Sequence, residues 1–162
     1  MKNFEEIFRF YNFQFLDTFD FNFLCKYNYY TLAKLLVEKD SKEINLTLLN
    51  LAAQRGSSSL VNFLLSRQKF EEIAFSNCSK LTEINLPSSV EIIGNFAFFG
   101  CTSLKKISIP SSVTEIGNSA FENCLSLATI SIPSYLHSIG KYCFCNCRSL
   151  VEIKAKSLEK RI

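Results

Sequence analysis

The sequence has few of the residues from which most enzyme sites are built. It contains one histidine, His137, and only five glycines, three of which recur at a single period. A lone histidine makes a catalytic triad or a histidine-based acid–base site hard to assemble. The glycines form no phosphate-binding loop, and the carboxylates are dispersed. We therefore expect a protein that is not an enzyme, with no catalytic residue and no cofactor.

Strong charge and long apolar runs are also lacking. Charged residues make up 20% of the chain and the formal net charge is +3, too weak a balance to favour nucleic acid or an anionic membrane surface. The apolar fraction of 48% predicts a buried core, but no stretch is long and apolar enough for an integral membrane segment. The N-terminus has no clean apolar run and no small-residue cleavage site. The default expectation is therefore a cytoplasmic protein whose seven cysteines are free thiols.

The C-terminal half contains an internal repeat of constant length. Its units begin at the evenly spaced Cys78, Cys101, Cys124 and Cys147. Three full units are followed by the start of a fourth: CSKLTEINLPSSVEIIGNFAFFG, CTSLKKISIPSSVTEIGNSAFEN, CLSLATISIPSYLHSIGKYCFCN and CRSLVEIKA. One unit cannot bury its own apolar face, whereas stacked units bury a continuous core. The period therefore predicts a solenoid.

Each unit predicts two short extended runs joined by turns. The segment L-x-x-I-x-I/L alternates apolar with other residues and ends at proline, which is typical of a strand with one buried face. A second extended run spans Val113 to Ile116, and we expect Gly117 to close it in a turn with positive φ. The run from Ala120 to Cys124 predicts a short helical turn or an irregular return.

The pattern of the second unit is specific. It is carried by Ser103-Leu104, Ile109-Pro110-Ser111-Ser112-Val113, Ile116-Gly117 and Ala120-Phe121. This pattern resembles the BspA-like (treponemal-type) leucine-rich repeat, and the resemblance covers residues 76–155. Proteins of that family are surface antigens and adhesins of bacteria and parasitic protists, so the resemblance implies protein binding at a cell surface. The array is short and stops within a unit, which predicts a fragment or a degenerate relative.

Residues 1–70 have helical periodicity instead. The run LLNLAAQRGSSSLVNFLLSR resembles the helix-turn-helix core of an ankyrin repeat, with Ala52-Ala53 packed between helices and Gly56 closing the first helix. Val61, Leu64 and Leu65 should face the stack. A degenerate copy is expected earlier in the chain, over residues 23–36. We also expect the helix near Leu60 to Arg67 to cover the open edge of the first β-coil.

The segment 1–23 holds eight of the sixteen phenylalanines. An amphipathic membrane-surface helix is one interpretation of this spacing. Because Glu5, Glu6, Asp17 and Asp20 interrupt the segment, we favour a helix that packs on the rest of the protein.

The cysteines admit two further interpretations. Cys143, Cys145 and Cys147 form C-x-C-x-C, but metal sites usually show paired C-x-x-C spacing, so we expect no metal here. Cys143 and Cys147 fit as small buried residues of the repeat, and only Cys145 lacks a structural position. A disulfide between neighbouring units is conceivable if the protein is exported.

The outward-pointing residues of the first strand in each unit form the candidate binding surface. They are two from each unit: Glu83 and Asn85, Lys106 and Ser108, Thr129 and Ser131, and Glu152 and Lys154. We call this set the polar stripe and expect it to lie on the concave face. Stacking should align it across the sheet, and solenoids use such surfaces to bind proteins. An inert solvated face is the competing interpretation.

The sequence thus predicts an α+β repeat protein with three parts. These are a helical, ankyrin-like domain over 1–70, BspA-like leucine-rich repeats over 76–155 and a basic tail over 156–162. The predicted function is protein–protein interaction with an unidentified protein partner, as a surface antigen or adhesin by resemblance. The alternatives are an intracellular scaffold, a degenerate repeat without a partner and, more remotely, a redox or metal protein.

Overall fold

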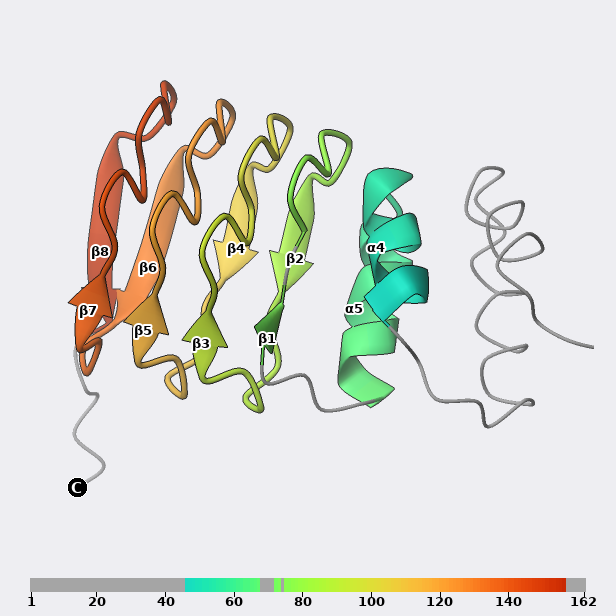
Figure 1. Ribbon diagram of the computed structural model, residues 1–162, viewed down its shortest axis with the longest axis horizontal. Helices are drawn as coiled ribbons and strands as arrows, with labels where there is room; N and C mark the ends of the chain where they lie inside the picture. Colours follow the sequence, from blue (N-terminus) through green and yellow to red (C-terminus); the bar gives the residue numbers. More distant parts are fainter. Residues whose placement is uncertain (1–45, 68–71, 74, 157–162) are drawn as a thin grey trace, which may run out of the picture.

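The computed structural model describes residues 46–67, 72–73 and 75–156 (Figure 1). In this part of the chain a pair of helices is followed by a solenoid of stacked coils. The phenylalanine-rich segment 1–23, the expected earlier helical copy over 23–36 and the tail residues 157–162 lie outside the described residues.

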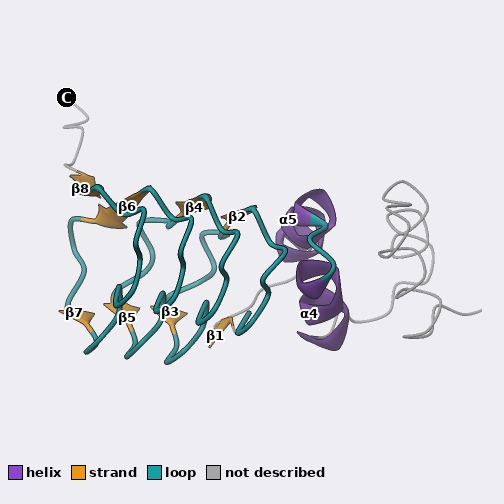
Figure 2. Ribbon diagram, turned by 90° about the horizontal axis from the view of Figure 1, so that it is seen from above, coloured by secondary structure: helices purple, strands orange, loops and turns teal. Residues whose placement is uncertain are grey.

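The solenoid is built from two parallel sheets, one on each side of the coils (Figure 2). The first sheet has the order β1-β3-β5-β7 and comprises β1 (Glu72–Ile73), β3 (Ile92–Ile93), β5 (Glu115–Ile116) and β7 (Ser138–Ile139). The second has the order β2-β4-β6-β8 and comprises β2 (Glu83–Asn85), β4 (Lys106–Ser108), β6 (Thr129–Pro133) and β8 (Glu152–Lys156). Alternate strands pair because each coil contributes one strand to each sheet. The predicted pair of extended runs in each unit is confirmed.

Equivalent residues of successive units meet in register. Ile84 pairs with Ile107, and Ile130 pairs with Ile153. The first three of these isoleucines are buried and their strand neighbours point outward. The repeat period is therefore the length of one turn of the solenoid, and each unit lies directly on the one before it.

Rows of stacked phenylalanines and cysteines fill the side of each coil where the chain passes from the first sheet to the second. Phe75, Phe98, Phe121 and Phe144 stack along the solenoid axis, with centroid separations of 5.4, 5.2 and 5.6 Å between successive rings. The first three rings are fully buried. The residues from Ala120 to Cys124 form consecutive hydrogen-bonded turns, which is the irregular return that the sequence predicts.

The expectation of a positive φ at the repeated glycines is wrong. Among the described glycines, φ is positive at Gly56 and Gly100 but not at Gly117. Glycine is needed at 117 because the preceding coil is too close. A Cβ there would lie 2.6 Å from the backbone nitrogen of Asn95 and 2.7 Å from the carbonyl carbon of Gly94. The absence of a side chain thus permits close stacking of the coils.

The two described helices are α4 (Leu46–Gln54) and α5 (Ser58–Arg67). Gly56, with φ of 79°, ends α4 as expected. Its N–H donates to the carbonyl of Ala53 and the N–H of Ser57 donates to that of Ala52, at 3.0 Å each, which is the Schellman pattern. The residues predicted to face the stack are buried: Ala52, Ala53, Val61, Leu64 and Leu65.

Helix α5 covers the edge of the second sheet at β2, as predicted (Figure 1). Side chains of α5 accept hydrogen bonds from backbone N–H groups of β2. In the interior of the sheet these N–H groups would donate to the carbonyl groups of a neighbouring strand. The N–H of Asn85 donates to Oδ1 of Asn62 at 2.9 Å, and the N–H of Glu83 donates to Oγ of Ser58 at 3.4 Å. These two contacts satisfy donors of the edge strand and block further strand addition there.

Candidate functional site

The structure brings the residues of the polar stripe together on the second sheet. Glu83 pairs with Lys106, and Asn85 pairs with Ser108. Ser108 in turn pairs with Ser131, and the pairing continues to the last strand with Thr129 opposite Glu152 and Ser131 opposite Lys154. Two parallel rows therefore cross the sheet along the solenoid axis. One runs from Glu83 to Glu152 and the other from Asn85 to Lys154.

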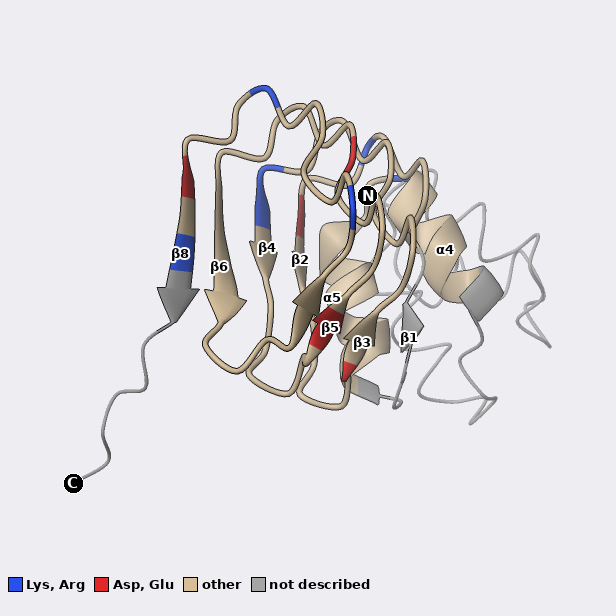
Figure 3. Cartoon of the chain, turned by 60° about the vertical axis from the view of Figure 1, so that its left-hand side comes forward, with Lys and Arg blue, Asp and Glu red and all other residues tan. Residues whose placement is uncertain are grey.

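Every member of the polar stripe is exposed or half-buried. The charges are of mixed sign, with an acidic residue on β2, a basic one on β4 and both on β8 (Figure 3). Glu152 and Lys154 form an ion pair at 3.2 Å between Oε2 and Nζ. Both side chains are more than half exposed, so this pair contributes little to stability. Either side chain can therefore exchange this ion pair for one with a charged group of a binding partner.

The cysteines at the start of the units behave as core residues. The thiol of Cys101 donates to the carbonyl of Phe75 at 3.1 Å, and that of Cys124 donates to the carbonyl of Phe98 at 3.2 Å. Burial raises the pKa of Cys78 to about 11 and that of Cys101 to about 12, from an ordinary value of 9.0. Burial raises the pKa of Cys124 in the same direction. These thiols are therefore protonated at neutral pH and are weak nucleophiles and metal ligands.

The C-x-C-x-C tract alternates between the inside and the outside of its coil. Cys143 is buried, Cys147 is half-buried with its thiol donating to the carbonyl of Phe121 at 3.0 Å, and Cys145 is exposed. All six described cysteines are free. Within residues 46–67, 72–73 and 75–156, no group of three potential ligands is arranged to hold a metal ion.

His137 lies exposed just before β7, where its backbone N–H donates to the carbonyl of Thr114 at 2.8 Å. Its position agrees with the expectation of a surface residue. In the part of the chain that the structure describes, no helix is long and apolar enough to span a membrane.

The sequence analysis missed a second surface feature. A groove with a cavity volume of about 340 Å³ crosses β3, β5 and β7 on the first sheet. It is lined by Ile92 to Asn95, by Glu115 to Asn118 and by Ser138 to Gly140. The repeat alignment contained the signal, because the glycines at 94, 117 and 140 leave a row without side chains between two rows that have them.

The comparisons with known proteins identify the repeat. A family model described as "BspA type Leucine rich repeat region (6 copies)" matches residues 68–162. No curated protein matches the chain. The ankyrin-like character of the N-terminal part stays a prediction.

Three solved structures are similar to the chain. The leucine rich repeat protein of T. pallidum (TpLRR) is 28% identical with a TM-score of 0.41, over 51% of this chain and 62% of that chain. A leucine rich cell surface protein from Faecalibacterium prausnitzii A2-165 is 23% identical with a TM-score of 0.40, over 58% and 34%. A leucine-rich repeat protein from Bacteroides ovatus ATCC 8483 is 34% identical with a TM-score of 0.40, over 49% and 27%.

The chain thus spans less than two thirds of the length of each of these three structures. The family model, in contrast, covers more than half of the chain and coincides with the stacked coils. This protein belongs to the BspA type leucine-rich repeat family.

Proposed function

We propose that the protein is a non-enzymatic interaction module that binds another protein through the polar stripe. The observation that carries the proposal is the alignment of the stripe in two rows across β2, β4, β6 and β8. A regular, exposed surface on a rigid solenoid is pre-organised, so a partner need not wait for loops to become ordered.

The chemistry of the polar stripe favours a polar protein surface as the partner. Glu83, Lys106, Glu152 and Lys154 give it two charges of each sign, and Asn85 adds an amide. Such a surface offers no continuous basic track for nucleic acid. Exposed charges of this kind steer association and set specificity more than they add affinity.

The double replacement Lys106→Ala and Glu152→Ala tests the proposal. Wild type and variant, each immobilised at the same density, would capture proteins from an extract of the source cells and from extracellular-matrix preparations. Proteins depleted at least about tenfold on the variant would be purified and their affinities measured by biolayer interferometry. We expect weaker binding with an unchanged far-ultraviolet circular-dichroism spectrum.

A matched control removes one charge of each sign outside the polar stripe. Lys80 and Glu91 are both exposed and lie outside the strands, so the pair Lys80→Ala and Glu91→Ala makes the same change in composition elsewhere. If the stripe variant binds like wild type, or if the control loses as much affinity, the polar stripe is the wrong surface.

We further propose that the module acts at a cell surface as an adhesin or antigen. Its membership in the BspA type family supports this placement. The alternative is an intracellular scaffold. An epitope-tagged copy in intact source cells distinguishes the two, because antibody and added protease reach the tag without permeabilisation only if the protein is exported.

A further inference from the structure

The groove across β3, β5 and β7 has two walls and a floor. The glycine row supplies the floor, because residues 94, 117 and 140 have no side chains. One wall carries the side chains of Ile92, Glu115 and Ser138, and the other carries Asn95 and Asn118. A volume of about 340 Å³ lies at the lower end of the range for small-molecule sites.

The asparagine wall presents hydrogen-bond donors. Oδ1 of Asn95 accepts from the N–H of Asn118 at 2.7 Å, and Oδ1 of Asn118 accepts from the N–H of Lys141 at 2.7 Å. These bonds fix the orientation of both amides and occupy their oxygens. Among the described residues neither Nδ2 group has a hydrogen-bond partner, and both side chains are exposed. Each amide can therefore donate to a ligand.

The opposite wall presents acceptors. Glu115 is exposed in the middle coil, and its carboxylate accepts hydrogen bonds; Ser138 in the next coil adds a hydroxyl that both donates and accepts. Lys141 follows the groove at Gly140 and balances the charge of Glu115. The groove and its margin are thus formally neutral and rich in hydrogen-bonding groups.

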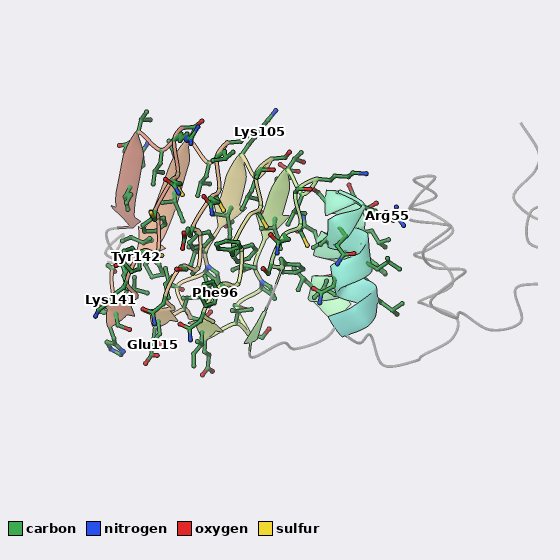
Figure 4. The ribbon with its side chains drawn as sticks, turned by 45° about the horizontal axis from the view of Figure 1, so that its top comes forward. Arg55, Phe96, Lys105, Glu115, Lys141 and Tyr142 are labelled. Carbon is green, nitrogen blue, oxygen red and sulfur yellow. The ribbon has the colours of Figure 1, made fainter. Side chains whose placement is uncertain are left out.

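Two exposed aromatic rings stand beside the asparagine wall. Phe96 is 51% exposed and Tyr142 is 71% exposed, and both occupy the same position in their units, two coils apart (Figure 4). Ser119 takes this position in the middle coil and is buried. Because Phe96 and Tyr142 are two coils apart, two strand spacings place them about 10 Å from each other. The two aromatic residues therefore stand on either side of a buried serine, next to the asparagine wall but outside the lining of the groove itself.

The backbone conformation of these aromatic residues is unusual. Phe96 has φ of 58° and Tyr142 has φ of 59°, a region that bulky residues seldom occupy. Ser119 has φ of 52° at the same position of the middle coil, so the positive φ belongs to the turn that each coil makes here. Phe96 packs edge-on against Phe99 at a centroid separation of 5.9 Å, so Tyr142 is the more accessible of the two rings.

We propose that this groove binds a neutral saccharide. A sugar ring carries hydroxyl groups that accept from the asparagine amides and donate to Glu115, and its C–H face packs on Tyr142, the more exposed of the two rings. An extended peptide fits less well. Peptides commonly bind by adding a strand to a free sheet edge, whereas the groove runs across the face of the sheet, where β3 and β5 are paired on both sides and only β7 at its end is an edge strand.

The test uses the full chain and four neutral hexasaccharides: cello-, malto-, manno- and chitohexaose. Binding would be followed by isothermal titration calorimetry and by the side-chain amide signals of Asn95 and Asn118 in nuclear magnetic resonance spectra. We expect at least one probe to bind and to shift both amide signals. Glu115→Ala and Tyr142→Ala should each weaken that binding about tenfold, because each removes an exposed group that contacts the ligand.

Two controls separate this site from the polar stripe. Lys106→Ala with Glu152→Ala should leave saccharide binding unchanged, and circular dichroism and thermal unfolding should show that the groove variants fold like wild type. The inference is overturned if no hexasaccharide binds, if binding survives both groove substitutions, or if an unstructured peptide library shifts the two amides while the sugars do not. Any of these results leaves the proposed protein-binding role of the stripe standing.

Discussion

Phe121 lies at the centre of the aromatic ladder and offers the sharpest test of the fold. Its ring is fully buried and stacks on Phe98 at 5.2 Å with an interplanar angle of 2°, and on Phe144 at 5.6 Å with an angle of 7°. Replacing a buried phenylalanine by alanine costs about 3–5 kcal/mol. Each aromatic pair adds about 0.5–1.5 kcal/mol beyond burial, and Phe121→Ala breaks two of them. Measured losses for buried phenylalanines already contain such contacts, so the two stacked pairs place Phe121→Ala in the upper part of the first range, and we expect a loss of about 4–5 kcal/mol in the free energy of unfolding.

Urea denaturation followed by circular dichroism and by tyrosine fluorescence would measure this loss. Phe144→Ala is the matched comparison, because Phe144 is only half-buried and its ring stacks on Phe121 alone among the described residues. Its loss should be about half as large. A value near zero for Phe121→Ala, or equal values for the two variants, would refute the stacking order of the coils.

Two further predictions address the spacing and the protonation of the core. Gly117→Ala should lower the free energy of unfolding by about 1–3 kcal/mol in urea titrations, because its Cβ would meet backbone atoms of the preceding coil; an unchanged midpoint would contradict the close approach. Burial raises the pKa of Cys101 to about 12 from 9.0, so the unfolded state loses this proton first as the pH rises. The stability from this group is complete below pH 9 and is lost toward pH 12. The stability of the Cys101→Ala variant should therefore decline less steeply than that of wild type between about pH 9 and 11. Parallel curves of stability against pH would show that the pKa of the Cys101 thiol is not raised in the folded protein.

Much of the solenoid could be predicted because the same residue pattern recurs in successive units, so each unit can be compared with the others. Positions such as Ile84, Ile107 and Ile130 recur once in every unit, and one physical explanation must fit every copy. The strands, their parallel pairing and the alignment of the polar stripe all follow from that period. The buried cysteine and phenylalanine rows follow from it as well.

The role of the repeated glycines could not be derived in the same way. Glycine permits a positive φ, but it also permits a close approach of two backbones, and the two roles leave the same trace in a sequence. In the structure the positive φ occurs at Asn123, at Ser119 and at the equivalent residues of the other units, and Gly100 is the one glycine at these positions. The close approach of two backbones occurs at Gly117. Because the groove depends on that glycine row, it was missed together with the reason for the row.

Each interior coil makes the same junctions with its two neighbours. The N–H of Phe98 donates to the carbonyl of Ala120, and one unit later that of Phe121 donates to the carbonyl of Cys143. The N–H groups of Gly117 and Gly140 repeat the pattern at 2.7 Å on the sheet side. A duplication or deletion of one unit within a gene would therefore leave all remaining junctions intact. Recombination can then lengthen or shorten the polar stripe and the groove by whole repeat units. Evolution can therefore adjust the length of both surfaces without altering the way the coils fold.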